Sequence, residues 1–302
     1  MPEPNTVILT HGEQNAENMR PRWTPILMQI TIRPEWGACM RVYLAIAVKS
    51  FQKHLTYRAA NLAGIITNMF FGAVYVFVYV ALFQGRTTVG GLDVRDAVTY
   101  VVLTQSLLMA MSAFGNRELS ESIMKGQIAS DLSRPLDFYL YWAAIDLGRA
   151  VYYLIFRGIP TFVIGLILFR ARLPGSPSDA LAFAACVATG IVMSYAFRFI
   201  PNSLAFWTTD ARGINYLVNT VILFFSGFIV PINFFPPVLR GLVLLLPFSA
   251  LANLPVNVYL GNVNGSELAQ ALVVQAVWII ALVIGGRALL KRLVTRLTVQ
   301  GG

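Results

Sequence analysis

Residues 59–83 read AANLAGIITNMFFGAVYVFVYVALF, a run without a charged side chain, a histidine or a proline. An α-helix needs about 20 consecutive, mostly apolar residues to cross the hydrocarbon core of a bilayer. The run exceeds that length, so it predicts a transmembrane helix. The rest of the fold depends on how often the chain repeats this pattern.

The same pattern recurs along the chain in shorter or interrupted form. One further segment, residues 150–169, is broken by Arg157 and Pro160. The sequence predicts six transmembrane helices, the first at 59–83 and the others at residues 97–114, 150–169, 180–200, 214–230 and 268–286. The predicted fold is therefore an all-α polytopic membrane protein.

The composition indicates a chain that is covered largely by lipid. Of the 302 residues, 57% are hydrophobic and 12% are charged, whereas a soluble domain carries roughly 25% charged residues. The formal net charge is +9, but the basic residues flank apolar runs and form no nucleic-acid-binding motif. We expect membrane lipid, and no nucleic acid, among the partners.

The basic residues indicate how the spans are oriented. Lysine and arginine concentrate in the cytoplasmic loops of membrane proteins. If the N-terminus is inside, most of the 23 basic residues lie on that side, and Arg157 and Arg198 fall within spans. We expect a multi-pass protein of the plasma or inner membrane with both termini in the cytoplasm. The basic residues left outside are Arg86, Arg95, Arg170, Arg172 and Arg240.

Two different regions precede the first span. Residues 1–39 are polar, lack the order of a cleaved signal peptide and are typical of a disordered extension. The transmembrane domain is then residues 40–302. Residues 36–58 place apolar side chains at helical spacing with basic residues between them, which predicts an amphipathic helix in the inner interface. The alternative is a cytoplasmic continuation of the first span.

The connection of residues 116–148 is too long for a simple turn. Its apolar and charged residues suit a short amphipathic helix that protrudes from the membrane and docks into a partner's groove. Gly126 would break this helix, and Pro135 could start the next one. The alternative is an ordinary interfacial loop. The candidate docking residues are Glu121, Lys125, Gly126, Arg134 and Pro135.

Residues 204–213 predict a tight cytoplasmic turn before the fifth span. Phe206 and Trp207 suit the membrane interface, whereas Asp210 and Arg212 could pair with each other or cap the start of a helix. We interpret the turn as an aromatic belt with a helix cap, and we keep these four residues as candidates for a functional turn.

Residues 231–248 interrupt the pattern between the fifth and sixth spans. An apolar run there lies between prolines and is too short to span, which predicts short re-entrant outer helices packed against the bundle. A broken helix with aromatic rings at its mouth would form an outer gate. The alternative is a loop with interfacial aromatic residues. The candidate gate residues are Ser226, Gly227, Pro231, Phe234, Phe235 and Pro236.

These three segments, in their order across six spans, resemble the permease subunits of ABC-2-type exporters. They are Lys125-Gly126-Gln-Ile with Leu132-Ser-Arg134-Pro135-Leu136, then Phe206-Trp207-Thr-Thr-Asp210-Ala-Arg212-Gly213, then Ser226-Gly227 with Pro231, Phe235, Pro236 and the later pair Pro247-Phe248. The likeness runs from about Met40 to the C-terminus and is nearest to multidrug-type permeases, while residues 1–39 depart from it. It implies that residues 116–148 form the coupling region, that two permeases pair around one path, and that each binds an ATP-hydrolysing subunit.

Other function classes lack their sequence signals. No phosphate loop ending in Gly-Lys-Ser/Thr occurs, so ATP and Mg would bind the partner subunit and this chain would hold no cofactor. Clustered metal ligands and the His-Glu-x-x-His helix of zinc proteases are absent too. The main alternative is an ion-coupled carrier or channel, but the six predicted spans contain no Asp, Glu or His to couple an ion.

Two arginines fall within predicted spans. A charge inside a span is costly, so Arg157 should face the bundle, a water-filled path or a partner subunit. It is a candidate for the substrate path, and a structural pairing is the alternative. Arg198 lies near the inner end of its span, where it can snorkel to water, and we assign it no role. The sequence does not identify the substrate or the second permease.

Overall fold

The computed structural model describes residues 36–208 and 210–294. The chain divides into two units, Met1–Cys39 and Met40–Gly302, and almost all of the described residues belong to the second. That unit is built from helices, and no β-strand occurs among the described residues. The prediction of an all-α fold is confirmed.

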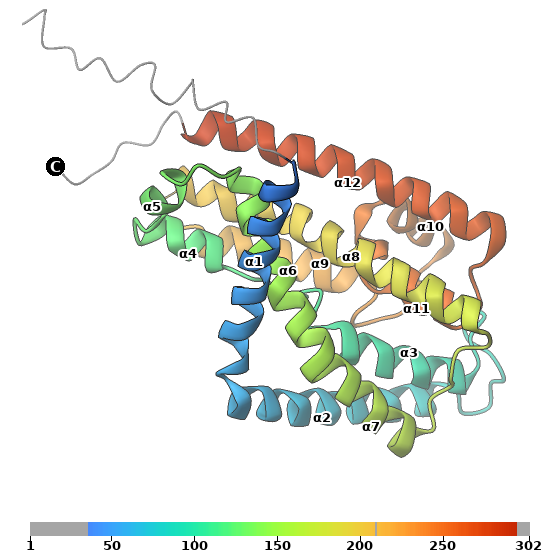
Figure 1. Cartoon of the computed structure of the whole chain (residues 1–302). Helices are drawn as coiled ribbons and strands as arrows, with labels where there is room; N and C mark the ends of the chain where they lie inside the picture. The colour runs from blue at the N-terminus through green and yellow to red at the C-terminus, as the bar shows by residue number, and fades with distance from the viewer. Residues whose placement is uncertain (1–35, 209, 295–302) are drawn as a thin grey trace, which may run out of the picture. The chain divides into compact units, whose positions relative to one another are not determined.

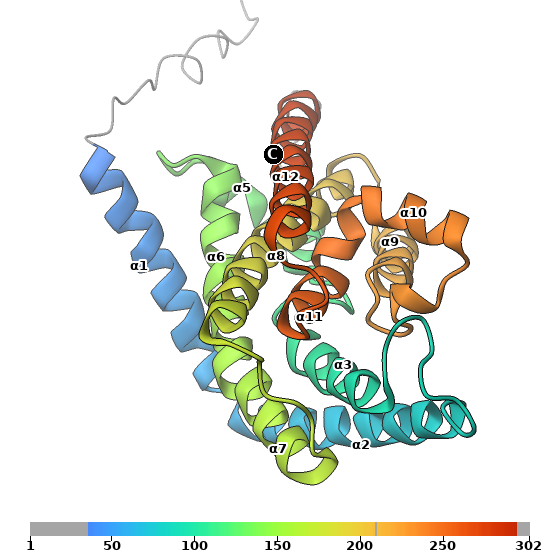
Figure 2. The ribbon, with the colours of Figure 1, turned by 90° about the vertical axis from the view of Figure 1, so that its right-hand side faces the viewer.

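Four helices in the described part of the chain are long and apolar enough to cross a membrane. Each covers all or nearly all of one predicted span. α12 lies on the side opposite α2 and α7, with α8 between them (Figures 1 and 2). These helices are α2 (Arg58–Leu82), the continuous helix α6–η2–α7 (Phe138–Phe169), α8 with η3 (Pro177–Phe206) and α12 (Gly265–Val294).

The other two predicted spans, 97–114 and 214–230, contain shorter helices. α3 (Val94–Leu107) and α9 (Arg212–Phe225) have 14 residues each. At 1.5 Å per residue this is about 21 Å, less than the roughly 30 Å of a hydrocarbon core. The chain leaves α3 through turns, in which Ser112 has a φ of 50°. The count of six spans is therefore not confirmed.

The helix of the predicted third span begins earlier than the sequence indicated. α6 (Phe138–Tyr153) starts where the Asp137 carboxylate accepts a hydrogen bond from the backbone N–H of Leu140 at 2.8 Å, which caps the helix. The connection from α3 therefore ends at Asp137 rather than at Gly148. Pro135 lies ahead of this cap instead of starting the helix.

α6 continues through η2 (Leu154–Gly158), a π-helical turn, into α7 (Ile159–Phe169). Pro160 is the second residue after this turn, and a proline cannot donate the hydrogen bond of an ordinary α-helix. Because a π-turn inserts one residue and shifts the local hydrogen bonds, the helix passes the proline without ending. Asp146 thereby lies inside a continuous candidate span, which corrects the expectation that the spans contain no acidic residue.

α1 (Trp36–Leu55) is a helix separate from α2. Within the second unit it runs across the direction of α2 and rests on α6 (Figures 1 and 2). Gly148 of α6 permits this contact, because a Cβ atom there would collide with the carbonyl oxygen of Ala47 and with Ser50. A straight continuation of the first span is excluded, and residence in the membrane interface stays a prediction.

The segment between α9 and α12 folds into short helices. α10 (Pro237–Leu245) agrees with the short apolar run between prolines, and η5 (Pro247–Ala250) follows it. α11 (Asn253–Tyr259) was not predicted; all its residues are buried, and it packs against α8 and α3. The re-entrant placement of these helices stays a prediction.

Candidate functional site

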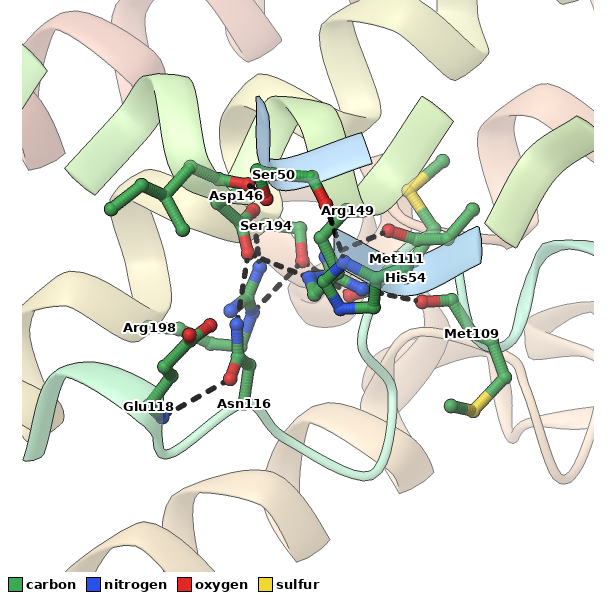
Figure 3. Close-up of polar contacts among 12 residues, drawn as sticks. Ser50, His54, Met109, Met111, Asn116, Glu118, Asp146, Arg149, Ser194 and Arg198 are labelled. Carbon is green, nitrogen blue, oxygen red and sulfur yellow. Dashed lines mark hydrogen bonds and ion pairs between the residues drawn. The ribbon is translucent and has the colours of Figure 1, made fainter. Parts of the chain in front are cut away.

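A buried cluster of charged side chains lies where the α3–α6 connection meets α6 and α8 (Figure 3). Asp146 of α6 accepts hydrogen bonds from Arg149 at 3.0 Å and from Arg198 of α8 at 2.9 Å. Asn116, just before α4 (Glu118–Met124), donates to the same carboxylate at 3.2 Å. The three charged residues are at most 5% exposed. One carboxylate therefore joins two long helices to the start of α4.

The two arginines also hold the chain that leaves α3. Arg149 donates to the carbonyl oxygens of Met109 at 2.8 Å and Ala110 at 3.2 Å. Arg198 donates to Ser194 Oγ at 3.2 Å, and the Ser194 hydroxyl donates to the carbonyl oxygen of Met111. Carbonyls at a helix C-terminus lack intrahelical partners and carry partial negative charge. Guanidinium groups satisfy them, which is why the chain can turn here while buried.

The charges of the cluster are unequal. One carboxylate faces two guanidinium groups, and Asn116 and the backbone carbonyls supply the remaining polar contacts. Removing one partner of a buried ion pair costs roughly 3–5 kcal/mol, because the other charge stays buried without compensation. Both oxygens of Asp146 are occupied. The cluster thus has the properties of a rigid junction.

No pattern in the sequence predicted this cluster. Arg198 was expected to snorkel to water, whereas the structure buries this side chain in an ion pair. Asp146 was expected in the connection of residues 116–148 and Arg149 directly before the third span, whereas both lie on α6, one turn apart. Their i, i+3 spacing downstream of the Asp137 cap was the signal that could have located them.

The α4–α5 segment (residues 118–132) lies beside this cluster. α4 and α5 (Ile128–Leu132) are divided by Gly126, whose φ of 72° ends the first helix as expected. Leu119 and Ile123 of α4 pack in one hydrophobic cluster with Phe138 of α6. The segment therefore turns its apolar side toward the helix bundle.

The candidate docking charges of this region are exposed. Glu121 and Lys125 lie 3.9 Å apart on α4. Arg134 lies 3.5 Å from Asp131 and over the ring of Tyr141. Partial burial raises the pKa of Asp131, although Arg134 opposes the shift. Exposed ion pairs contribute only about 0–1 kcal/mol to stability, so Glu121 and Lys125 can exchange their partners at low cost.

Both ends of the region are tied to α1. Lys53 of α1 pairs with Glu118 at 2.5 Å, and the backbone N–H of Asp137 donates to the hydroxyl of Tyr43 at 3.0 Å. Arg287 of α12 also reaches the Asp137 carboxylate, at 3.2 Å. An open groove of about 880 Å³ lies between α1 and the α4–α5 segment. The α4–α5 segment and the start of α6 thus contact α1 and α12 at their surfaces.

The turn before α9 packs beside α4 through η3 (Leu204–Phe206). The ring of Phe206 lies 6.4 Å from that of Phe138, whereas Trp207 is 68% exposed. Arg212 donates through Nε to both Asp210 oxygens, at 3.0 and 2.9 Å, and through its backbone N–H at 2.8 Å. These hydrogen bonds lower the pKa of Asp210 to about 2. Asp210 therefore pairs with Arg212 and also binds the first N–H of α9.

The candidate gate residues lie in a segment that is held from several sides. Gly227 has a φ of 92°, and a Cβ there would collide with the hydroxyl of Tyr100 on α3. That hydroxyl donates to the Gly227 carbonyl oxygen at 3.0 Å. The backbone N–H of Asn253 on α11 donates to the Ser226 carbonyl oxygen at 3.0 Å. Pro231 is buried beyond them. Only glycine fits at position 227.

The aromatic residues of this segment pack against other rings. Phe234 meets Tyr79 of α2 edge-on at 5.8 Å, and Phe235 stacks on Phe224 of α9 at 5.5 Å. Pro236 is exposed at the start of α10. The rings therefore bridge α2, α9 and α10.

A network of neutral groups supports this segment. Asn257 of α11 donates to the carbonyl and side-chain oxygens of Asn253 at 2.8 and 3.0 Å. Its own side-chain oxygen accepts from Asn233 and Asn262 at 3.4 Å each. The hydroxyl of Tyr100 lies 3.5 Å from the Asn253 side-chain oxygen. The contacts connect α3, α11 and the candidate gate without a charged side chain among them.

Comparison with known families decides the class of the protein. A family model described as ABC-2 family transporter protein matches residues 69–301, which is more than half of the chain. The chain belongs to the ABC-2 transporter family. No curated protein matches it.

Membership in the ABC-2 family makes the chain a membrane-embedded transport subunit and confirms the resemblance drawn from the sequence. The matched region of this ABC-2 protein includes the charge cluster, the α4–α5 segment and the candidate gate. Within residues 36–208 and 210–294 there is no group of three or more His, Cys, Asp or Glu side chains that could hold a metal ion.

Arg157, the candidate for the substrate path, lies on the π-turn of this ABC-2 protein. It donates to the side-chain oxygen of Asn68 at 2.7 Å, and Asn68 donates to the carbonyl oxygen of Gln105 at 3.1 Å. The guanidinium packs directly on Gly64, where a Cβ would collide with it. Its Nε has no partner among the described residues. The structure gives Arg157 a neutral structural partner.

Proposed function

We propose that this chain is the membrane-spanning permease subunit of an ATP-driven exporter, and that a separate ATP-binding subunit docks on the α4–α5 segment. The position of this segment carries the proposal. Its apolar side packs in the bundle, and Glu121 and Lys125 are exposed. α1 holds its first residue, Glu118, and α1 and α12 hold Asp137 beyond its other end. Docking requires an exposed face, and coupling requires firm attachment, which the buried contacts of Leu119 and Ile123 provide.

Motion at α4 would reach the long helices through the charge cluster. Asn116 accepts a hydrogen bond from the backbone N–H of Glu118 at 3.1 Å and donates to Asp146. Its carbonyl oxygen accepts from Asn202 of α8 at 3.0 Å. A shift of α4 would therefore act on α6 and α8 directly, and on the end of α3 through Arg149.

In this proposal the energy source is on another chain. The sequence has no Gly-rich loop ending in Gly-Lys-Ser/Thr, so ATP and Mg²⁺ bind the partner subunit. ABC-2 family membership supports an ABC ATP-binding partner in general. ATP hydrolysis by the partner, on the cytoplasmic side, would then move the α4–α5 segment.

A second permease, a copy or a relative, would complete the translocation path. α3 and α9 are too short to cross a bilayer alone, and backbone at membrane depth must be covered by protein or water. Tyr216 and Leu217 of α9 are 62% and 68% exposed. These features support pairing of two chains beside α9.

In the proposed orientation both termini lie in the cytoplasm and the protein lies in the plasma or inner membrane. The segment from Ser226 to Pro236 then closes the outer end of the path, and Arg157 lies beside the path. The likeness to multidrug-type permeases supports amphipathic compounds as the exported class.

An ion-coupled carrier is the competing function, and one observation favours it. Asp146 lies buried in a continuous candidate span, where carriers place the carboxylates that bind ions or protons. Two arginines and Asn116 already occupy this carboxylate, which leaves it poorly suited to bind a transported cation.

Co-purification tests the proposal. The chain is expressed with the ATP-binding proteins encoded beside it, solubilised gently and purified through a tag on this chain. We expect a stoichiometric ATP-binding subunit whose hydrolysis depends on the chain. Lys125→Glu on α4 should weaken this association about tenfold or more, because charge repulsion replaces attraction at the docking surface.

The matched control is Arg240→Glu, which reverses an exposed basic residue on α10, away from the α4–α5 segment. It should leave the association unchanged. A folded chain that retains no ATP-binding subunit would favour the carrier, and equal effects of the two variants would refute docking on α4.

A further inference from the structure

A second cavity lies apart from the α4–α5 segment and the charge cluster. It has a volume of about 290 Å³ and is bounded by α12, α8 and the short helices η5 and α11. Most of its wall is apolar. Along α12 the wall is formed by Glu267, Gln270, Ala271, Val274, Gln275 and Trp278, and across from α12 chiefly by Met193, Leu244, Leu246, Pro247 and Leu254.

Gln275 is the unusual member of this wall. Its side chain is 3% exposed, and neither its amide nitrogen nor its amide oxygen has a hydrogen-bond partner among the described residues. The helix otherwise turns residues such as Val273, Val277 and Ile280 outward. A buried amide without partners is costly, and polar side chains inside membrane helices are usually kept for a function. A guest in the cavity would supply the missing partners.

The other polar end of the wall is acidic. Glu267 is the one charged residue that lines the cavity, it is exposed, and it makes no ion pair within the described part of the chain. Glu267, Ala271 and Gln275 follow one another at four-residue spacing, so they share one face of α12. Glu267 and Gln275 are then about 12 Å apart along the helix axis.

The far end of the same face carries a fixed aromatic ring. Trp278 donates its indole N–H to the carbonyl oxygen of Leu245 on α10 at 2.8 Å. This hydrogen bond orients the indole and leaves its faces for apolar contact. Along α12 the cavity thus offers a carboxylate, an apolar wall, an amide and an indole, in that order.

We propose that this cavity binds a cationic amphiphile. Its ammonium or other cationic group lies at Glu267, its apolar body lies along Ala271, Val274 and Leu246, and a hydrogen-bonding group about 12 Å from the cation meets the Gln275 amide after rotation of that side chain. The Glu267 carboxylate favours a positively charged ligand. The Gln275 amide favours a ligand with a hydrogen-bonding group at the matching distance from that charge.

This inference goes beyond the proposed function, because the site is formed by this chain alone. Binding can be measured on the purified full-length chain without an ATP-binding subunit. Failure of this test therefore leaves the exporter proposal untouched, and loss of the ATP-binding partner leaves this site untouched.

The probe is a bromoalkyl trimethylammonium compound with an amide in its chain and the bromine at the far end. Bromine quenches tryptophan fluorescence on contact, and Trp278 lies about 16 Å along the helix from Glu267. Two analogues serve as comparisons: one has a hydroxyl in place of the ammonium, and one has methylenes in place of the amide. Quenching is titrated with the chain in lipid nanodiscs.

We expect the parent probe to bind about tenfold or more tightly than either analogue, because each analogue loses one polar partner. Glu267→Gln should abolish the preference for the cation and keep that for the amide, whereas Gln275→Leu should do the reverse. Trp278→Phe should remove the quenching. Asp179→Asn, a neutralised acid at the start of α8 outside the cavity, should change nothing.

Equal binding of the three compounds to the unaltered chain would mean partition into lipid alone, and the proposal would be wrong. Quenching that survives Trp278→Phe would place the probe elsewhere and would also overturn it. Glu267→Gln and Gln275→Leu are each checked for folding by size-exclusion chromatography. A variant that elutes at the same volume as the unaltered protein is folded.

Discussion

The two ends of the helix bundle bury polar chain breaks by different means. Near α4, Asp146 is paired with Arg149 and Arg198, and these charges hold the chain that leaves α3. Near α11, Tyr100 and Asn253 hold the break at Gly227 with neutral groups. The first junction is charged and tightly bonded, and the second is uncharged.

The difference bears on how each end responds to displacement. Separating buried charges is expensive, because each stranded ion has lost its hydration. Neutral hydrogen bonds contribute only about 0.5–1.5 kcal/mol each, and a group such as Asn257 already shares contacts of 2.8 to 3.4 Å with several neighbours. The charged junction should transmit motion as a unit, whereas the neutral one can exchange partners.

The largest expected effect is at the charged junction. Asp146→Ala leaves Arg149 and Arg198 buried without their carboxylate, so unfolding free energy should fall by roughly 3–5 kcal/mol. Thermal unfolding of the purified chain in detergent measures it. Glu121→Ala, which removes the partner of the exposed Lys125, should cost no more than about 1 kcal/mol.

Equal destabilisation by Asp146→Ala and Glu121→Ala would break the comparison. A second change sharpens it, because replacing Asp146 and Arg198 together by leucine should recover part of the loss. This double variant removes both charges of the Asp146–Arg198 ion pair, and the leucine side chains can fill the space.

A smaller effect is expected at the neutral junction. Gly227→Ala adds a Cβ at a φ of 92°, against the hydroxyl of Tyr100. Backbone strain and this contact should cost about 1–3 kcal/mol in thermal stability. Gly85→Ala is the control, since Gly85 has a φ of 75° and open space around it.

The difference between the two alanine variants isolates the contact with Tyr100. Adding Tyr100→Phe to Gly227→Ala removes the obstructing hydroxyl and should restore part of the stability. If Gly227→Ala lowered thermal stability as much as Asp146→Ala, the neutral junction would be no easier to displace than the charged one.

The smallest effect is expected at an exposed pair, which extends the comparison to solvent. Arg212 holds the pKa of Asp210 at about 2, below the unfolded value of about 3.9. The folded-state pKa is lowered, so its stabilisation is present above about pH 4 and is lost as the pH falls toward 2. Hydrogen exchange of the first α9 amides, corrected for intrinsic rates, should show no change in protection from pH 7 to 5 and a loss below about pH 4.

Asp210→Asn should reproduce that loss at pH 7, because the amide keeps the size of the side chain and removes the charge. Protection that is the same in this variant as in the unaltered chain would show that the pair does not stabilise the start of α9.

Sequence patterns located elements wherever a local signal was sufficient. α2 was found almost to the residue, because a charge-free run has few other interpretations. The break at Gly126 followed from the need for positive φ after a short amphipathic helix. The start of α6 was missed because Asp146 and Arg149 resemble loop residues until their partners are known.

The remaining features depend on contacts between distant residues. Arg198 lies 52 residues from Asp146 in the chain, and no local periodicity indicates that pairing. α11 is short and contains two asparagines and a proline, so only its burial against α8 and α3 makes a helix there intelligible. The lengths of α3 and α9 were overestimated because apolar residues continue past the point where the helical backbone ends.

The π-turn at Leu154–Gly158 divides one long helix into two parts that need not rotate together. It holds one residue more than an α-helical turn, and each α-helical residue corresponds to about 100° of rotation. If the turn relaxed to α-helix, α7 would swing by about that angle while Asp146 kept its grip on α6. Because α7 packs on α2 and α3, such a rotation would also change the contacts of α7 with those helices, and Arg157 lies at the joint between the two halves.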